Sequence, residues 1–375
     1  MKINQVSIKN FKSLLDINLT LGQLTLIAGI NSSGKSSFIQ ALLLIKENKN
    51  TLKNISTLKQ TQLQHIGCNT LLSSGEYTEL GNKNNLLSYD SSDDTIYFSI
   101  HHDDKSHFDI LIESKANFDI KKSAGNHQLL DIFDDECFCY LKTNRTAPAN
   151  DFPYSEEKIS QNSIGLEGEY TAHYLTVKNH QALMIEALKH PKSITNQLLE
   201  NTALWLSEIS SGVSLSAQSY PELERVGLSY QYEYGDNTTG KLSPLQVGFG
   251  LTYILPVIVA ILKAKPNDLV MIENPESHLH PKGQAKIAEL CAIAANHGVQ
   301  VIVETHSDHF LNGLRVATKN NIISPDKSQI YYFYKNAGEL STHAQQINID
   351  NNGKLTDWPV GFFDEWDNQL DQLLW

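Results

Sequence analysis

The pattern of hydrophobic and polar positions predicts a protein in which buried strands alternate with helices. Mostly apolar runs at residues 24–28, 269–272 and 299–303 are short and end in glycine or polar residues, which is typical of strands buried on both faces. Residues 38–45 and 251–262 instead repeat their apolar residues every three or four positions, which predicts helices. This combination predicts an α/β fold with a mixed β-sheet core and helices.

The middle of the chain has a different pattern. Residues 95–100, 108–112 and 137–141 alternate and are rich in β-branched and aromatic residues, which predicts successive antiparallel strands. Residues 178–210 carry helical spacing only in short pieces, and there is no heptad repeat that would form a long coiled coil. We therefore predict three parts, which are an N-terminal part at residues 1–83, a β-rich and helical insertion at residues 84–240, and a C-terminal part at residues 241–375.

A phosphate-binding loop is the strongest chemical signal. Residues 29–36 fit G-x-x-x-x-G-K-[ST] without a mismatch, between a predicted strand and a predicted helix, an order that argues against a chance match. Gly29 and Gly34 permit backbone angles that point successive N–H groups at phosphate oxygens, and the helix N-terminus adds its positive dipole end. Lys35 is expected to reach the β- and γ-phosphates, and the Ser36 hydroxyl to bind Mg²⁺. The other candidate nucleotide contacts of this stretch are Asn31, Ser32, Ser33 and Ser37.

A second glycine-rich turn stands directly before the apolar helical run at residues 251–262. Gly248 and Gly250 flank a phenylalanine, and Thr252 supplies a hydroxyl at the expected start of the helix. Such a turn at a helix N-terminus is an anion-binding device, but a plain helix cap would have the same residues. The neighbouring motifs favour the anion site, so Gly248, Gly250 and Thr252 are candidate nucleotide contacts.

Carboxylates follow the buried strand at residues 268–273. Glu273 ends this strand, where a carboxylate is suited to the Mg²⁺ of a bound nucleotide. The next residue is Asn274, and an asparagine cannot accept a proton from an attacking water. Either Glu276 serves as the general base, or hydrolysis is slow.

Other candidate residues give weaker signals when each is taken alone. His278 and His280 have metal-ligand spacing but lack a third ligand, so a turn at an interface is the preferred interpretation. His306 belongs to the sequence Thr-His-Ser that ends a further buried strand, predicted to begin at Gly298. Arg145 ends a predicted strand and faces either the nucleotide or, as we prefer, a salt-bridge partner in the protein.

Four motifs taken together resemble one group of ATPases. Ile-x-Asn-Phe-Lys-Ser-Leu begins at Ile8, Val-Gly-Phe-Gly at Val247, Glu-Asn-Pro-Glu-x-His-Leu-His-Pro at Glu273, and Trp-Pro-x-Gly-Phe-Phe-Asp-Glu at Trp358. The first motif, followed closely by the phosphate loop, resembles the SMC/RecF-like branch of ABC-type ATPases. The other three together resemble a bacterial family of AAA/ABC-type ATPases that is often found in phage-defence gene sets. The chain is also similar to the ATPase head of overcoming-lysogenization-defect proteins. We expect no Toprim nuclease of their kind, because only about 70 residues follow His306.

The resemblance implies a fold and a role for each motif. It implies a P-loop NTPase of the ABC-ATPase head type, with the insertion as a lid. In that family a basic residue at the position of Lys12 lies near the nucleotide. The turn at residues 248–252 contacts the γ-phosphate held by the opposite subunit, and a histidine at the position of His306 hydrogen-bonds the γ-phosphate. The expected catalytic residues are Lys35, Glu273, Glu276 and His306, and the expected metal ligands are Ser36 and Glu273.

The resemblance also implies an activity. We expect a homodimer, or a higher oligomer, that sandwiches ATP and Mg²⁺, hydrolyses ATP and gates a separately encoded nuclease or toxin. Its setting would be anti-phage defence or a DNA-related process. The alternative is an ATP-locked scaffold with little turnover, which Asn274 favours. A transporter ATPase subunit would need a standard signature turn and a transmembrane partner, and the variant turn argues against it.

Composition narrows the partners and the location. The net charge of −12 argues against nucleic-acid binding driven by charge alone, although a local basic groove would suffice. The most hydrophobic run, at residues 251–262, contains Pro256 and is too short to cross a membrane. No secretory signal follows Met1, and the four cysteines contain no C-x-x-C pair. We expect a cytoplasmic protein with reduced cysteines.

Overall fold

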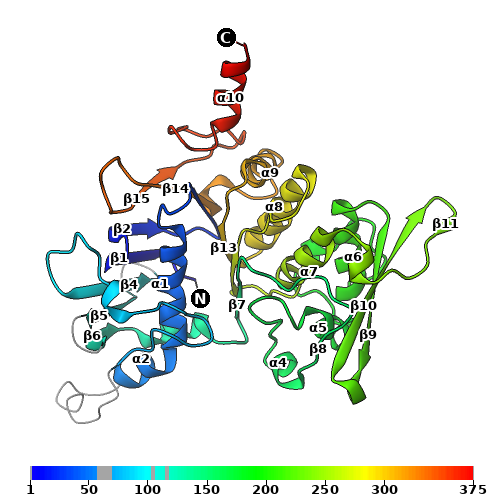
Figure 1. Ribbon diagram of the computed structural model, residues 1–375, viewed down its shortest axis with the longest axis horizontal. Coiled ribbons are helices and arrows are strands. Elements are labelled where there is room, and N and C mark those ends of the chain that lie inside the picture. Colours follow the sequence, from blue (N-terminus) through cyan, green and yellow to red (C-terminus); the bar gives the residue numbers. More distant parts are fainter. Residues whose placement is uncertain (1, 57–69, 103–105, 115–117, 375) are drawn as a thin grey trace.

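A six-stranded sheet forms the centre of the computed structural model, with the strand order β15–β14–β3–β13–β12–β7 (Figure 1). Neighbouring strands in it are parallel except for β14 and β15, which are antiparallel. The structure describes residues 2–56, 70–102, 106–114 and 118–374. The strands of the central sheet are β3 (Leu24–Gly29), β7 (Phe138–Leu141), β12 (Leu269–Glu273), β13 (Gln300–Glu304), β14 (Ser328–Tyr334) and β15 (His343–Ile347).

The parallel strands bring the predicted motifs to one edge of the central sheet. β3 leads into the phosphate loop, β12 ends at Glu273, and β13 ends at Glu304, two residues before His306. Carboxyl ends of neighbouring parallel strands lie at the same edge, which is where ligands bind in open α/β sheets. β13 lies between β3 and β12, so Glu304 is one strand away from the phosphate loop and Glu273 is two.

A five-stranded antiparallel sheet in the order β2–β1–β4–β5–β6 contains the strands predicted at residues 95–100 and 108–112. The prediction that residues 137–141 continue these strands is wrong, because β7 pairs in parallel with β12. Its alternation instead separates Phe138 and Tyr140, which pack in one hydrophobic cluster, from Cys139 and Leu141, which pack in the other. The three-part division at residues 83/84 and 240/241 stays a prediction. The strands of this sheet are β1 (Gln5–Phe11), β2 (Leu14–Thr20), β4 (Thr95–His101), β5 (His107–Glu113) and β6 (Asp119–Gly125).

Helix α1 (Lys35–Glu47) lies between the two sheets. Phe38 and Leu42 of α1 share one hydrophobic cluster with Ile8 of β1 and with Ile302 of the central sheet. Because apolar side chains surround most of α1, the helix is buried rather than amphipathic. Packing of α1 in the core therefore fixes the orientation of the phosphate loop that precedes it. Helix α2 (Lys49–Ser56) follows α1.

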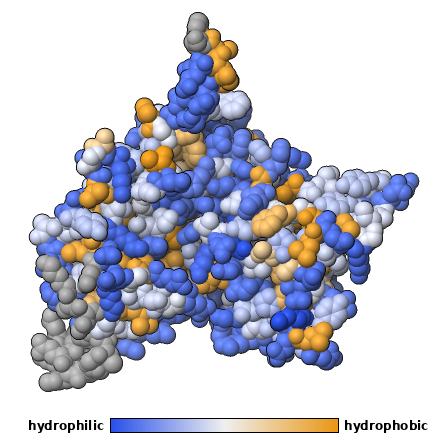
Figure 2. All heavy atoms as spheres, viewed as in Figure 1, coloured by the Kyte–Doolittle hydropathy of each residue, from blue (hydrophilic) through white to orange (hydrophobic). Residues whose placement is uncertain are grey.

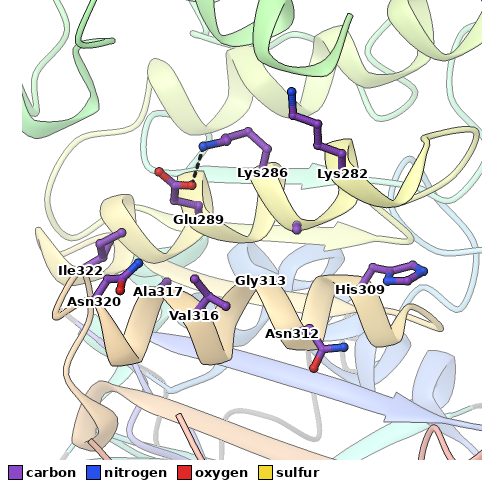
Figure 3. A pocket seen from close by; sticks show the side chains of 11 residues that line it. Lys282, Lys286, Glu289, His309, Asn312, Gly313, Val316, Ala317, Asn320 and Ile322 are labelled. Carbon is purple, nitrogen blue, oxygen red and sulfur yellow. Dashed lines mark hydrogen bonds and ion pairs between the residues drawn. The ribbon is translucent and has the colours of Figure 1, made fainter. Parts of the chain in front are cut away.

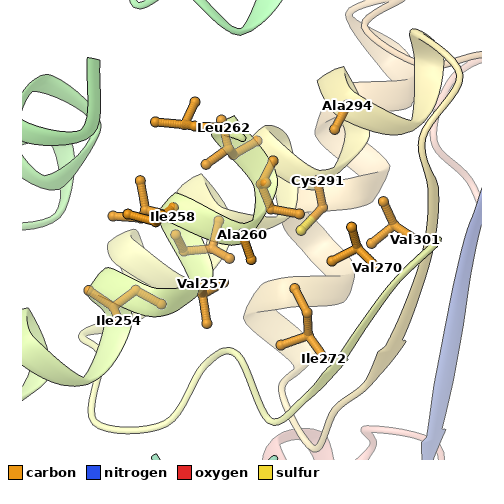
Figure 4. Packing of buried hydrophobic residues seen from close by; sticks show 14 of the residues in the cluster. Ile254, Val257, Ile258, Ala260, Leu262, Val270, Ile272, Cys291, Ala294 and Val301 are labelled. Atoms are coloured by element: carbon orange, nitrogen blue, oxygen red, sulfur yellow. The ribbon is translucent and has the colours of Figure 1, made fainter. Parts of the chain in front are cut away.

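Helices α7 (Phe249–Leu262), α8 (Pro281–Asn296) and α9 (Asp308–Lys319) cover the other face of the central sheet. Figure 4 shows Ile254 and Val257 of α7 with Val270 and Ile272 of β12 in this core. Residues 251–262 are all buried, so the most hydrophobic run of the sequence is a core helix. None of the helices in the described parts of the chain is long and apolar enough to cross a lipid bilayer.

A smaller four-stranded sheet and several short helices lie beside α7 (Figure 1). Its main feature is the antiparallel pair β9 and β10, to which β8 and β11 add two short strands. The strands are β8 (Phe152–Pro153), β9 (Val213–Tyr220), β10 (Arg225–Tyr234) and β11 (Asn237–Thr238). The helices are α4 (Glu156–Ser160), α5 (Thr171–Val177) and α6 (Leu198–Ile209). The 3₁₀ helices among the described residues are Lys83–Asn85, His127–Phe133, Glu186–Leu188, Pro221–Leu223, Pro244–Gln246 and Pro325–Lys327.

The C-terminal helix α10 (Glu365–Leu374) projects from the body of the molecule (Figure 1). Figure 2 shows hydrophobic and hydrophilic side chains next to each other along this projection. Trp366, Leu373 and Leu374 are all more than two-thirds exposed. The segment before α10 instead packs on the body, where Phe362 is buried against Tyr332.

Candidate functional site

The phosphate loop joins β3 to α1 in the predicted order of strand, loop and helix. Gly29 (φ 151°) and Gly34 (φ 99°) both have backbone angles that L side chains rarely adopt. A Cβ atom at Gly34 would collide with Thr342 and Ser13, which pack against the loop. The curvature of the loop therefore depends on these two glycines.

The side chain of Lys35 folds back over the phosphate loop. Its Nζ donates to the main-chain carbonyls of Gly29 (2.9 Å) and Ile30 (2.8 Å). Burial lowers the pKa of Lys35, whereas the nearby carboxylates of Glu304 and Glu276 raise it. The cation is thus held at the loop, where phosphate oxygens can replace the two carbonyls as hydrogen-bond acceptors.

The carboxylate beside Ser36 belongs to Glu304, which is not among the predicted site residues. Ser36 Oγ donates to Glu304 Oε1 at 3.0 Å. Glu304 is only 4% exposed, and its Oε2 has no hydrogen-bond partner among the described residues. Burial and the negative charge of Glu273 raise the pKa of Glu304 to about 7. A buried carboxylate with a free oxygen therefore faces the first turn of α1.

Glu273 lies beside Glu304 in the sheet register but has other partners. Its Oε1 accepts from the hydroxyl of Tyr140 at 2.8 Å, and its Oε2 accepts from Thr143 Oγ1 at 2.8 Å. Tyr140 is in β7, and Thr143 follows that strand. Burial and the charge of Glu273 raise the pKa of Tyr140, so its hydroxyl stays protonated and donates. Both oxygens of this predicted metal ligand are thus engaged on the β7 side.

Arg145 holds the end of β12 through main-chain atoms. Its Nη1 donates to the carbonyl of Glu273 (2.8 Å) and its Nη2 to the carbonyl of Asn274 (2.6 Å), while the guanidinium lies over the ring of Tyr253. Asn274 has a left-handed backbone conformation (φ 45°), which asparagine tolerates better than most residues. The preferred expectation of a salt bridge is therefore wrong for Arg145 within the described residues, since its acceptors are carbonyls. It nevertheless has a structural role beside the candidate site.

Glu276 and His306 are in direct contact. The main-chain N–H of His306 donates to Glu276 Oε1 at 2.7 Å, and Glu276 Oε2 is buried without a partner among the described residues. Burial raises the pKa of Glu276. Partial burial and then the positive charge of Lys35 lower the pKa of His306, so its imidazole is neutral near pH 7. The structure thus brings Lys35, Glu276 and His306 to one place.

Lys12 lies in the turn between β1 and β2, alongside α1. Its Nζ donates to Gln40 Oε1 at 2.6 Å, and burial lowers its pKa. Gln40 is one helical turn beyond Ser36, so Lys12 is placed near the helix that the phosphate loop begins. Of the other loop candidates, Asn31 and Ser32 are exposed, Ser37 is half-buried and Ser33 is buried.

The C-terminal tail borders the opening of the phosphate loop. A cavity of about 270 Å³ is lined by Gly29, Ile30 and His306 together with Tyr332 and the tail residues 361–365. The tail is held in shape locally, because its Asp364 carboxylate accepts from the main-chain N–H of Gly361 at 2.8 Å. The sequence motif that begins at Trp358 thus reaches the candidate site, although about 320 residues separate it from the phosphate loop.

The turn at residues 248–252 lies at a different cavity. Gly248 and Gly250 line a hollow of about 180 Å³ with His278, and this cavity shares no residue with the one at the phosphate loop. Thr252 is 3% exposed, and its hydroxyl is hydrogen-bonded to the hydroxyl of Tyr230 at 3.2 Å. Within one chain, the two halves predicted for the ATP site are therefore separate surfaces.

A third cavity, of about 360 Å³, lies between α8 and α9 (Figure 3). Lys286 and Glu289 form an ion pair at its rim with a distance of 2.7 Å, and Val316 and Ala317 belong to the α9 side. None of the predicted nucleotide contacts lines it.

Comparison with protein families decides the classification. The family model described as "AAA domain, putative AbiEii toxin, Type IV TA system" matches residues 78–312. The chain belongs to this AAA family. A second model, of a protein family of unknown function (DUF3696), matches residues 323–373, which include the tail at the phosphate loop. A search of curated proteins finds no significant match.

The fold of this AAA protein is similar to SMC head domains. An Smc head bound to the C-winged helix domain of ScpA is 13% identical, with a TM-score of 0.56 over 93% of this chain and 98% of that chain. An Smc head with an extended coiled coil, bound to the C-terminal domain of ScpA derived from Pyrococcus furiosus, is 12% identical, with a TM-score of 0.53 over 100% and 99%. This likeness confirms the predicted P-loop NTPase fold of the ABC-ATPase head type.

The AAA family implies nucleotide binding, and the residues present suit a nucleotide with its metal. No group of three or more His, Cys, Asp or Glu side chains in the described ranges is placed to hold a metal ion by itself. Mg²⁺ bound with a nucleotide needs less, because one or two carboxylates, the phosphates and waters complete its shell. The Ser36 hydroxyl and the unpartnered Oε2 of Glu304 are oxygen atoms that could bind such a Mg²⁺.

The sequence carried a signal for one of the unpredicted residues of this AAA protein. Glu304 is a carboxylate at the carboxyl end of a buried strand, which is the same signal that identifies Glu273. No local signal exists for Tyr140 and Thr143, since they contact Glu273 across 133 and 130 residues of sequence. The ABC-type ATPases that the chain resembles have a glutamine loop that contacts Mg²⁺; Gln64 is too far from a predicted strand end to be assigned to it, and it lies outside the described residues.

Proposed function

We propose that this AAA protein binds ATP with Mg²⁺, dimerises around the nucleotide and hydrolyses it slowly to gate a separately encoded effector. The observation that carries the proposal is the meeting of Lys35, Ser36 and Glu304 at the carboxyl edge of the central sheet, with Glu276 and His306 next to them. These groups supply a cation for phosphate oxygens, a hydroxyl and carboxylate for a metal, and a candidate base.

The separation of the two cavities supports a site shared between two subunits. The turn at Gly248 and Gly250 does not line the cavity at the phosphate loop of its own protomer but lies at another cavity. Bringing the turn of one protomer against the loop of the other would complete both sites. Because the Thr252 hydroxyl is bonded to Tyr230, the contact would come from main-chain N–H groups of the turn.

The biological setting we propose is bacterial anti-phage defence or a related DNA process. The family description names AbiEii-type toxins of type IV toxin–antitoxin systems, which supports defence. The similar Smc heads bind ScpA in their structures, which supports an effector that docks on the head. The net charge of −12 gives no support to nucleic-acid binding driven by charge alone.

ATP-dependent dimerisation tests the proposal. Light scattering with ATP and Mg²⁺ is expected to show a dimer for the wild type and no ATP-dependent dimer for Lys35→Ala, because the phosphates lose their cation. Lys9→Ala is a matched control, since Lys9 pairs with Asp16 on the surface at 3.0 Å. ATP-dependent dimerisation that persists in Lys35→Ala would rule out the proposed role of the loop.

An ATP-locked scaffold is the second candidate function. Two observations favour it: Asn274 stands where ABC-type enzymes have their base, and both oxygens of Glu273 are engaged by Tyr140 and Thr143. Steady-state phosphate release separates the two functions. A protein that binds ATP and dimerises, yet shows no turnover alone or with its effector, is a scaffold.

A further inference from the structure

The carboxylate nearest to the phosphate loop comes from β13 rather than from β12. Strand spacing in a sheet is about 4.8 Å, so the main chain of Glu304 lies roughly 5 Å from β3 and that of Glu273 roughly 10 Å. Glu304 is also paired in register with Ile27 of β3, only two residues before the loop begins at Gly29. The main chain of Glu304 is thus nearer to the loop than that of Glu273, and the partners of the two side chains decide which carboxylate reaches it.

The hydrogen-bond partners of the two glutamates also favour Glu304. Glu304 Oε1 accepts from Ser36 Oγ at 3.0 Å, and its Oε2 is buried with no partner in the described parts of the chain. Glu273 accepts from Tyr140 and from both the hydroxyl and the main-chain N–H of Thr143, on the side away from the loop. One carboxylate therefore has a free oxygen at the loop, and the other has none.

We propose that Glu304, and not Glu273, is the carboxylate that holds the Mg²⁺ of a bound nucleotide together with Ser36. The inference rests on the proposed ATP binding. A serine hydroxyl has one proton to donate and two lone pairs to offer. Ser36 can keep its hydrogen bond to Glu304 Oε1 while a lone pair faces the metal. Glu304 Oε2 is then the oxygen available to the metal or to a water in its shell.

This assignment leaves Glu273 as a positioning residue. Its carboxylate ties the end of β12 to Tyr140 and Thr143 of the β7 side, and Arg145 holds the same strand end through the Glu273 carbonyl. The metal-binding carboxylate would then come from β13, the strand next to the phosphate loop, and not from β12.

Metal-dependent nucleotide affinity tests the inference without relying on hydrolysis. A fluorescent ATP analogue is titrated with Mg²⁺ and with EDTA, and Mn²⁺ binding to the ATP complex is followed by electron paramagnetic resonance. Glu304→Gln keeps the size and the acceptor for Ser36 but loses the charge, so the gain in affinity from Mg²⁺ is expected to fall at least tenfold. Affinity in EDTA should be unchanged or higher. Glu273→Gln, the matched comparison, should reduce the gain by less than about threefold.

The outcomes separate this inference from the proposed function. A wild type that binds no ATP with or without Mg²⁺ overturns the proposed function. A wild type with a Mg²⁺-dependent gain that survives Glu304→Gln and is lost in Glu273→Gln overturns the inference alone. If Glu304→Gln does not fold, Glu304→Asp is used. Aspartate keeps the negative charge, but its side chain is one methylene shorter, so the carboxylate lies further from Ser36. An undiminished Mg²⁺ gain in Glu304→Asp would then count against the inference.

Discussion

Glu276 accepts a hydrogen bond from the main-chain N–H of His306, with its Oε1 2.7 Å from the nitrogen. The bond connects the turn after β12 to the residue expected to face the γ-phosphate. The other oxygen, Oε2, is buried without a partner among the described residues, and burial raises the pKa of Glu276. A carboxylate with one anchored and one unpaired oxygen is suited to accept a proton.

Replacing Glu276 by glutamine tests this role. Glutamine keeps an acceptor for the His306 N–H but cannot take a proton, so ATP turnover is expected to fall by about 100-fold or more. Phosphate release measures turnover, and a fluorescent ATP analogue checks that binding is retained. Unchanged turnover in Glu276→Gln would mean that the side chain only positions His306.

Replacing Arg145 by methionine tests its hold on the strand end. Arg145 is 2% exposed and donates to the carbonyls of Glu273 and Asn274, which would lose their donor. The free energy of unfolding is expected to fall by about 3 kcal/mol, because these main-chain carbonyls lose the charged donor that the buried guanidinium supplies. Urea denaturation measures the change.

An exposed arginine provides the control for this variant. Arg225 forms a surface ion pair with Asp151 at 3.1 Å, and Arg225→Met should change the free energy of unfolding by less than about 1 kcal/mol. Equal effects of Arg145→Met and Arg225→Met would show that the buried hydrogen bonds of Arg145 do not stabilise the fold.

Neutralising the tail carboxylates tests their effect on nucleotide affinity. Asp364 and Glu365 line the cavity at the phosphate loop, where their charges would repel a polyphosphate. The double variant Asp364→Asn, Glu365→Gln is expected to bind ATP a few-fold more tightly at low salt, and the gain should shrink as added salt screens the charges. Asp357→Asn is the matched control, since this tail carboxylate does not line the cavity. Weaker binding in the double variant would instead indicate that the tail helps to hold the nucleotide.

The pH dependence of stability tests the burial of His173. Its Nδ1 accepts from the main-chain N–H of Ser155, its ring packs on Tyr154, and burial lowers its pKa while Glu156 acts in the opposite direction. Between the lowered folded pKa and the ordinary value of about 6.5, the unfolded state binds more protons, so this histidine makes stability fall as the pH falls.

The corresponding variant isolates this contribution from those of other groups. Between pH 7.5 and 5.5, His173→Gln should lose less stability than the wild type, as measured by thermal unfolding at each pH. Buried carboxylates such as Glu304, whose pKa is raised to about 7, change stability in the opposite sense in both proteins. The comparison therefore uses the difference between wild type and variant. Identical pH profiles would exclude a burial effect at His173.

Much of the fold follows from local pattern. The buried strands that lead to the phosphate loop, Glu273 and His306 were predictable because mostly apolar runs and glycines are properties of neighbouring residues. The pairing of the strand Phe138–Leu141 was predicted wrongly because it depends on a residue segment that is distant in the sequence. Its alternating residues pack in two different hydrophobic clusters, one on each face of the sheet, and its pairing partner is β12, more than 120 residues further along the chain.

The sequence by itself determined the phosphate loop and the order of the strand ends around it. Eight consecutive residues, 29–36, contain the glycines, the lysine and the hydroxyl, so no distant partner is needed to recognise them. Only the tertiary structure decided which carboxylate faces that loop. Ser36 meets Glu304 across 268 residues, while Tyr140 and Thr143 draw Glu273 to the other side. Side-chain direction depends on the partners that the sheet brings together, and local sequence does not contain them.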